Sequence, residues 1–276
     1  DNSVKLDLNF KDISNLKEKK LFLLDMDGTL YLGENLFEGT IPFLHSILSH
    51  GGRYRFVTSI SSKNVSSYVG KMKRLGVDFV TENDFYTSAQ AALSLMKEKF
   101  QDELIYVQGT RSFVQGLKEG GLHVTEEYDL NAKAILVGFD TELTMKKLET
   151  TAKMLTFLPN VPYYATNPDW VCPTEWGYVP DCGSMCFGLE KATLRAPIYI
   201  GKPEKTMIET CLLKYGIDKK DAVLFGDRPY TDIKSGNRAG IDTVLVLSGE
   251  TKESDLPSLA KEERPTYLLS SIAEVF

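Results

Sequence analysis

Residues 21–30 read LFLLDMDGTL, an apolar run that ends in two aspartates, Asp25 and Asp27, followed by Gly28 and Thr29. A continuous apolar run of this kind is typical of a strand that is buried on both faces of a parallel sheet. Open parallel sheets bind their ligands beyond the carboxyl ends of the strands, which is where these two carboxylates lie. The stretch therefore predicts both a fold class and the position of a site.

Strands and helices alternate along most of the chain, which predicts an α/β fold with a parallel sheet covered on both faces. Amphipathic helices are expected after Thr40, around 65–75, at 206–215 and at 231–239. Strands are expected at Leu21–Leu24, Tyr54–Thr58, Leu104–Val107, Ala134–Val137, Ile198–Ile200, Ala222–Phe225 and Thr243–Leu247.

The middle of the chain contains strand–helix units of its own and ends in an irregular stretch, YYATNPDWVCPTEWGYVP. This is enough chain for a second domain inserted into the first. We expect a discontinuous catalytic core over 1–82 and 182–276 and an inserted α/β domain over 83–181.

The composition is that of an ordinary globular protein, with 42% hydrophobic residues in a chain of 276. A formal net charge of −6 argues against nucleic-acid and anionic-membrane partners, because either would need a basic face. No apolar run approaches the roughly 18 residues that span a bilayer, and we expect no secretory leader. Four cysteines without a disulfide or C-x-x-C pattern favour free thiols and a cytoplasmic location.

Polar residues also follow other expected strands: Thr58 closes RYRFVT, Asp227 follows AVLFG with Asp232 one helical turn later, and Lys202 follows IYIG. A single Asp before Gly most often marks a turn or a helix cap. A cluster is more informative, because neighbouring carboxylates raise one another's pKa unless a cation lies among them. Mg²⁺ prefers such oxygen ligands, and a lysine would balance the charge of a phosphate.

These residues are similar to a known set of motifs. Asp25-Met26-Asp27-Gly28-Thr29, Thr58, Lys202 and Gly226-Asp227 with Asp232 resemble the four ordered motifs of the haloacid-dehalogenase-like (HAD) superfamily. The long gap between Thr58 and Lys202 resembles the branch with a large α/β cap between motifs two and three. FYTSAQAA, YYATNPDW, IGKPEKTMI and GDRPYTDI are similar to the NagD-like phosphatases, which include para-nitrophenyl phosphatases. The resemblance implies a Rossmann-like core with an inserted cap.

The resemblance also implies roles for the first two aspartates. Asp25 would be the nucleophile that attacks phosphorus and forms an aspartyl-phosphate. Asp27 would contact the substrate, protonate its leaving alkoxide and later deprotonate the attacking water. An acid at position 27 suits hydrolysis, although phosphomutases carry it too.

By the same resemblance, Mg²⁺ would be held by the side chains of Asp25 and Asp227 and by the backbone carbonyl of Asp27. Asp232 would orient either a metal-bound water or the nearby lysine.

The phosphate would be bound by Thr58, the amide of Ser59 and Lys202. Many relatives read Thr-Asn-Asn-Ser at the second motif, whereas this chain reads Thr58-Ser59-Ile60-Ser61. The departure leaves the phosphate contacts in place and puts the substrate specificity in doubt.

The inserted domain is expected to choose the substrate through the loop with Asn167, Asp169 and Trp170. The aromatic residues Trp170, Trp176 and Tyr178 fit either internal packing or a platform for a sugar or base ring.

The function that we expect is Mg²⁺-dependent hydrolysis of small phosphate esters, such as sugar phosphates or nucleotides. Two alternatives stay open: a phosphotransferase or phosphomutase, and a catalytically silent phosphate-binding protein. A homodimer is also left open.

Overall fold

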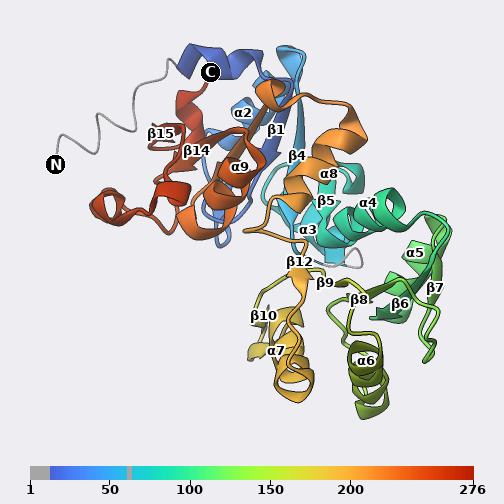
Figure 1. Cartoon of the computed structure of the whole chain (residues 1–276). Coiled ribbons are helices and arrows are strands. Elements are labelled where there is room, and N and C mark those ends of the chain that lie inside the picture. Colours follow the sequence, from blue (N-terminus) through green and yellow to red (C-terminus); the bar gives the residue numbers. More distant parts are fainter. Residues whose placement is uncertain (1–12, 61–63) are drawn as a thin grey trace. The chain divides into compact units, whose positions relative to one another are not determined.

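The computed structural model describes residues 13–60 and 64–276, which form two compact units. Unit 1 comprises 13–58, 64–86 and 202–276, and unit 2 comprises 59–60 and 87–201 of these residues (Figure 1). Each unit is built around its own sheet, and each is described by itself below. None of the helices in the described ranges is long and apolar enough to cross a bilayer.

Unit 1 contains a six-stranded sheet in the order β15-β14-β13-β1-β4-β5. The pairs from β15 to β4 are all parallel. Every residue of β1 and β13 is buried, which is why both strands read as continuous apolar runs. The strands are β1 (Leu21–Leu24), β4 (Arg53–Thr58), β5 (Phe85–Thr87), β13 (Ala222–Gly226), β14 (Asp242–Val246) and β15 (Tyr267–Leu269). The helices are α2 (Thr40–Ser49), α3 (Val65–Arg74), α8 (Thr206–Tyr215) and α9 (Lys234–Ala239).

Aromatic rings fix the packing around β1. The Phe22 ring stacks on Phe225 of the neighbouring strand at a centroid distance of 6.0 Å, and Phe43 of α2 packs against Phe225 at 5.3 Å. Burying one such side chain contributes about 2 kcal/mol to stability. The site-bearing end of β1 therefore projects from a well-packed strand.

Unit 2 contains a five-stranded parallel sheet in the order β12-β9-β8-β6-β7. The strands are β6 (Leu104–Gln108), β7 (His123–Thr125), β8 (Ala134–Val137), β9 (Tyr163–Ala165) and β12 (Ile198–Tyr199). The helices are α4 (Ser88–Phe100), α5 (Arg111–Glu119), α6 (Met145–Phe157) and α7 (Cys182–Thr193). Within this unit, α4 and α5 lie on the opposite side of the sheet from α6 and α7 (Figure 1). A hairpin of β10 (Val171–Thr174) and β11 (Gly177–Pro180) is attached.

Each of these four helices begins with a side-chain cap, which explains where they start. In each case the side chain before the helix accepts a hydrogen bond from a backbone amide in the first turn. The caps are Thr87 for α4, Thr110 for α5, Thr144 for α6 and Asp181 for α7. Each cap stabilises its helix by about 1 kcal/mol.

The structure confirms the predicted α/β class, with two differences in detail. The strand around Ile198 pairs with Tyr164 of β9, so α7 and β12 belong to unit 2, which extends to Gly201. The sequence analysis had assigned 182–276 to the catalytic core, because a short apolar run does not reveal which sheet it joins. The stretch expected to be irregular contains the β10–β11 hairpin. That unit 2 acts as a cap stays a prediction.

Candidate active site

Asp25 and Asp27 follow β1 at the carboxyl edge of the unit 1 sheet. The Asp25 carboxylate is partly buried, and Asp27 is exposed. The chain turns sharply after them, since Gly28 has a φ of +83° and its amide donates to the Tyr31 carbonyl at 2.7 Å. Asp27 Oδ1 accepts a hydrogen bond from the amide of Gly33 at 3.3 Å. The turn thus directs Asp25 inward and leaves Asp27 accessible to solvent.

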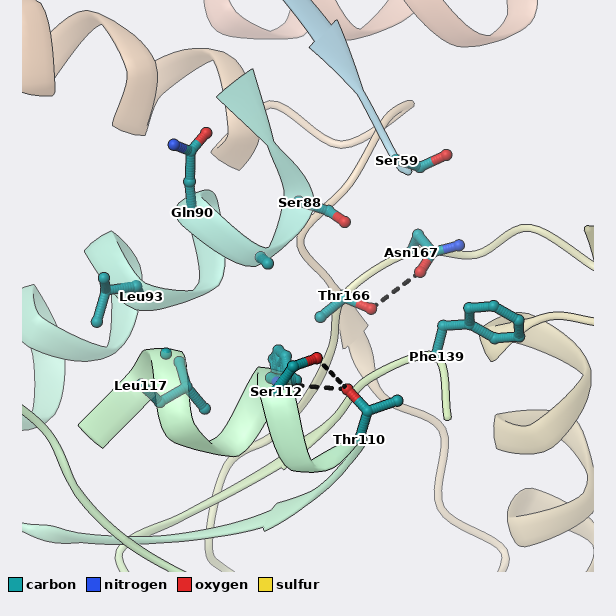
Figure 2. A pocket seen from close by; sticks show the side chains of 13 residues that line it. Ser59, Ser88, Gln90, Leu93, Thr110, Ser112, Leu117, Phe139, Thr166 and Asn167 are labelled. Atoms are coloured by element: carbon teal, nitrogen blue, oxygen red, sulfur yellow. Dashed lines mark hydrogen bonds between the residues drawn. The ribbon is translucent and has the colours of Figure 1, made fainter. Parts of the chain in front are cut away.

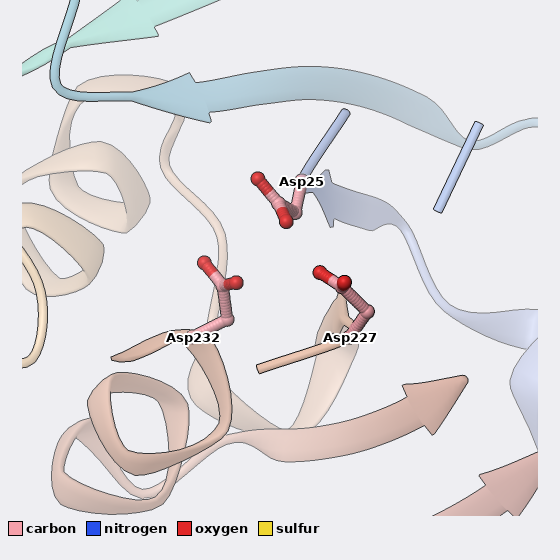
Figure 3. A group of neighbouring side chains, drawn as sticks. All are labelled: Asp25, Asp227 and Asp232. Carbon is pink, nitrogen blue, oxygen red and sulfur yellow. The ribbon is translucent and has the colours of Figure 1, made fainter. Parts of the chain in front are cut away.

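Two more aspartates reach the same point from the neighbouring strand, β13. Asp227 follows it directly, and a π-helical turn over Pro229–Ile233 brings back Asp232. Asp227 and Asp232 are 3% and 1% exposed. Carboxylate oxygens of Asp25, Asp227 and Asp232 lie within 4.8 Å of one another (Figure 3). The acids that the sequence placed after two different strands, Asp25 after β1 and Asp227 and Asp232 after β13, therefore converge.

Lys202 supplies a positive charge next to this cluster. Its Nζ donates to Asp232 Oδ1 at 2.5 Å and to the Val57 carbonyl at 3.2 Å. Val57 precedes Thr58, the last residue of β4, so the lysine lies against the carboxyl end of that strand. Its side chain is 13% exposed. Asp232 thus contacts the lysine directly, as one of the two expected roles requires.

The electrostatics of the cluster favour a bound cation. Burial raises the pKa of Asp25 well above its ordinary value; Asp232 and Asp227 raise it further, and Lys202 opposes them. Burial also raises the pKa of Asp227, and the hydrogen bond from the Glu250 amide opposes this by lowering it. Negative charge is therefore costly at this point unless a cation compensates it.

The residues present fit a metal ion. Asp227 Oδ1 is buried and has no hydrogen-bond partner among the described residues. Such an atom is expected to have a partner, and a cation could satisfy it. The metal-ligating atoms that Asp25, Asp227 and Asp232 offer are carboxylate oxygens, which suit a hard divalent cation.

The segment after β14 also builds the site, and the sequence analysis missed it. The Glu250 amide donates to Asp227 Oδ2 at 2.8 Å, and Thr251 Oγ1 donates to the Asp227 carbonyl at 2.6 Å. A Cβ on Gly249 would lie 2.2 Å from Asp227 Oδ2, so only glycine fits there. A glycine three residues after a strand of the same parallel sheet was the available indication.

The residues expected to choose the substrate lie in unit 2. Asn167 Nδ2 donates to Asp169 Oδ2 at 2.6 Å and to Asp181 Oδ1 at 3.1 Å. Trp170 is 58% exposed and packs edge-on against Phe187 at 5.5 Å. Ser59 belongs to unit 2 as well, whereas Ser61 of the second motif lies outside the described residues. Asn167 is therefore buried and bonded to two carboxylates, whereas Asp169 and Trp170 lie on the surface of the unit.

Comparison with known proteins agrees with this geometry. A family model described as haloacid dehalogenase-like hydrolase matches residues 22–123, and one described as HAD-hydrolase-like matches 199–275. An acid sugar phosphatase of Staphylococcus haemolyticus (strain JCSC1435) is 32% identical over 91% of this chain and 93% of its own. The ribonucleotide monophosphatase NagD of Escherichia coli (strain K12) is 32% identical over 93% of this chain and 98% of its own.

The crystal structure of 4-nitrophenylphosphatase from Thermotoga maritima is also similar. It matches with a TM-score of 0.79 and 33% identity, over 96% of this chain and 98% of that chain. The chain therefore belongs to the HAD-like hydrolase family. Within the family it lies in the branch of NagD and the p-nitrophenylphosphatases, and it is a phosphatase.

Proposed function

We propose that the chain is a Mg²⁺-dependent phosphomonoester hydrolase that acts on small phosphorylated metabolites through an aspartyl-phosphate. The observation that supports this best is the convergence of Asp25, Asp227 and Asp232 beside Lys202. A phosphate dianion beside these carboxylates needs both a cation among them and a lysine near them. The three carboxylates fit a cation, and Lys202 is the lysine.

In the first step, Asp25 attacks phosphorus, forming an aspartyl P–O bond while the ester P–O bond breaks. The leaving oxygen takes a proton from Asp27, whose side chain is exposed enough to meet substrate. In the second step, Asp27 removes a proton from water, which attacks the phospho-enzyme and releases inorganic phosphate. One residue thus serves as acid and then as base, and the enzyme returns to its starting state.

Phosphate would be held by Thr58, by the amide of Ser59 and by Lys202. The lysine neutralises charge on the transferring group as the transition state forms. The short contact with Asp232 limits the positions that its ammonium group can adopt, so Asp232 is a positioning residue in this scheme.

Mg²⁺ would be held by the Asp25 and Asp227 side chains and the Asp27 carbonyl, with Asp232 outside the ligand set. When bound, the metal supplies positive charge that neutralises the phosphate and the carboxylates. Magnesium is favoured over zinc because the candidate ligands are oxygens, with no histidine or cysteine in the cluster.

For the substrate, we propose a sugar phosphate or a nucleoside monophosphate. The support is that the similar proteins include an acid sugar phosphatase and a ribonucleotide monophosphatase. The groups that bind phosphate and metal are common to all phosphomonoesters and do not separate these two classes.

The test is phosphate release from para-nitrophenyl phosphate after exhaustive treatment with EDTA, with Mg²⁺ or Zn²⁺ added back. We expect activity to return with Mg²⁺. Activity that survives EDTA, or returns with Zn²⁺ alone, would contradict the metal assignment. Transfer of the phosphoryl group to an added alcohol without free phosphate would favour the phosphotransferase alternative, and no turnover at all would favour a silent protein. A screen of phosphorylated sugars and nucleotides would then identify the substrate.

A further inference from the structure

Unit 2 contains a cavity of about 460 Å³, which is large enough for a small organic molecule. It is lined by residues of α4 and α5, by residues that follow β6, β8 and β9, and by Ser59 (Figure 2). The first turns of α4 contribute Ser88 and Gln90, and α5 contributes Ser112 and Phe113. The proposed chemistry in unit 1 uses none of these side chains.

The position of the cavity follows from the topology of the sheet. From β6 the chain continues to β7 on one side, and then returns to β8, β9 and β12 on the other side. The order of the strands therefore reverses between β6 and β8. Open α/β sheets bind ligands at the carboxyl ends of the strands at such a switch point. Thr110 follows β6, Phe139 follows β8 and Thr166 follows β9, and all three line the cavity.

The wall at the switch point is built to bring an aromatic ring close to the strand ends. Gly109 follows β6 and Gly138 follows β8. A Cβ on either glycine would lie 3.1 or 3.3 Å from the Phe113 ring, closer than ordinary contact. Both strands thus end in the residue that lets Phe113 lie against the backbone. Leu93, Leu117 and Phe139 extend this apolar wall.

The polar groups of the cavity are few and neutral. No charged side chain is found among the lining residues in the described part of unit 2. The hydroxyl groups come from serine and threonine, and Thr110 Oγ1 accepts from the Phe113 amide as the α5 cap. Asn167 Oδ1 accepts a hydrogen bond from Thr166 Oγ1 at 2.9 Å, and Asn167 Nδ2 donates to the carboxylates of Asp169 and Asp181. Its amide is therefore held in one orientation.

We propose that this cavity is a binding site for an uncharged, flat heterocycle, such as a nucleobase. Among the described residues that line the cavity, a phosphate or carboxylate would find no cation, and burying it unpaired would be costly. A sugar carries a hydroxyl on most of its carbons, and the apolar wall would leave several without partners. A heterocycle offers two apolar faces for Phe113, Leu93 and Leu117, and a polar edge for the hydroxyl and amide groups.

Such a ring can come from two sources, a phosphorylated substrate that carries it as leaving group or a free nucleoside. The chemistry of the site is the same for both. Ser59, one of the lining residues, follows Thr58 directly in the chain.

Gly116 permits a direct test, because a Cβ built there meets nothing within 4 Å and the residue lines the cavity. Gly116→Leu therefore adds volume at the wall, and its Cβ displaces no neighbour. Gly188→Leu is a matched control: it lies in α7 of the same unit, its Cβ also meets nothing within 4 Å, and it does not line the cavity. Both changes replace a glycine inside a helix, so neither should lower the melting temperature.

The experiment titrates the full chain, with Mg²⁺ present, with adenosine and with uridine in a calorimeter. We expect saturable binding of at least one nucleoside to the wild type and to Gly188→Leu, and at least tenfold weaker binding to Gly116→Leu. Failure of both nucleosides to bind, or equal binding to the two variants, would overturn the proposal. If Gly116→Leu does not fold, Ser112→Leu at the exposed start of α5 takes its place.

Kinetics then separate the two sources. If the ring belongs to the substrate, the nucleoside competes with para-nitrophenyl phosphate, and Gly116→Leu raises KM for adenosine 5′-monophosphate alone. If it is a separate metabolite, the nucleoside binds without competing. Either result supports the site. Hydrolysis of para-nitrophenyl phosphate by both variants reports on the proposed function independently, so failure of one proposal leaves the other standing.

Discussion

The carboxyl edges of the two sheets carry opposite chemistry on the same architecture. In unit 1 the strands β1 and β13 are followed by aspartates that converge within 4.8 Å beside a lysine. In unit 2 the strands β6, β8 and β9 are followed by glycine, threonine and phenylalanine around a neutral cavity. Both sheets are parallel, so both place the residues after their strands at one edge.

The two edges together indicate that the topology of a sheet determines where a site forms. The few residues that follow the strands determine what the site binds. In the unit 1 cluster, Asp232 is paired with Lys202, and the carboxylates of Asp25 and Asp227 fit a cation. The neutral groups in unit 2 can bind a ligand only by shape and hydrogen bonds. Changes in unit 1 should therefore affect turnover of every substrate, and changes in unit 2 should affect the choice among them.

The largest effect is expected for Asp25→Asn. The change removes the attacking oxygen and keeps the volume of the side chain, so turnover should fall by about 10⁴-fold or more while the fold is kept. Phosphate release from para-nitrophenyl phosphate measures the loss, and circular dichroism checks the fold. Nucleoside binding by unit 2 should be unchanged, which sharpens the contrast between the two edges. A variant that keeps a few per cent of wild-type turnover would exclude Asp25 as the nucleophile.

The next effect is expected for Asp27→Asn, and its size should depend on the leaving group. For a sugar phosphate, whose alkoxide needs a proton, we expect a loss of about 10²- to 10⁴-fold. The loss should be smaller for para-nitrophenyl phosphate, because nitrophenolate leaves readily without one. The comparison of kcat for the two substrates is the measurement. An equal loss for both would mean that Asp27 is not the acid or that chemistry does not limit the rate.

A smaller effect should follow from Gly249→Ala. Gly249 is not itself a proposed metal ligand, but the change would displace Asp227, which is one. The new Cβ would lie 2.2 Å from Asp227 Oδ2 and 2.7 Å from the Cα of Gly28, so Asp227 has to move. We expect the Mg²⁺ concentration for half-maximal activity to rise by about tenfold or more.

Gly70→Ala in α3 of the same unit is the control for this change, because its Cβ meets nothing within 4 Å. An unchanged metal requirement in Gly249→Ala would show that Asp227 does not hold the metal.

The parts of the molecule that the sequence predicted well are those in which local pattern and burial agree. The buried strand before Asp25 and the strand Ala134–Val137 have the expected bounds, because each is a continuous apolar run in a parallel sheet. The strand at Ile198 was found but placed in the wrong sheet, since strand pairing is a long-range property that two apolar residues do not encode. The hairpin at Val171–Pro180 was missed because its outward side chains are apolar rather than polar.

For the candidate site, acids after buried strands were predictable because residue type and position both pointed to the sheet edge. The contribution of Gly249 and Glu250 was not, because it depends on a steric approach and on a backbone amide. The cavity of unit 2 was not predictable either. Its lining consists of common neutral residues, and only the order of the strands brings them together.

The smallest effect is expected for Trp170→Ala, which tests whether substrate choice extends beyond the cavity. Trp170 does not line the cavity, and its ring is 58% exposed with an edge contact to Phe187. Losing that contact should cost about 0.5–1 kcal/mol of stability. We expect KM to change a few-fold for large substrates and the ranking of substrates to shift, because uniform binding contacts appear in KM when chemistry is slow.

Para-nitrophenyl phosphate offers this surface little to hold, so its rate should barely change. Trp176→Ala is the matched control for loss of an exposed ring, because Trp176 is 77% exposed and lies in the turn of the β10–β11 hairpin, which begins directly after Trp170. If Trp170→Ala lowers activity toward all substrates in the same proportion, with a lower melting temperature, Trp170 serves the packing of unit 2. Substrate choice would then rest on the neutral cavity alone, and the contrast between the two sheet edges would be complete.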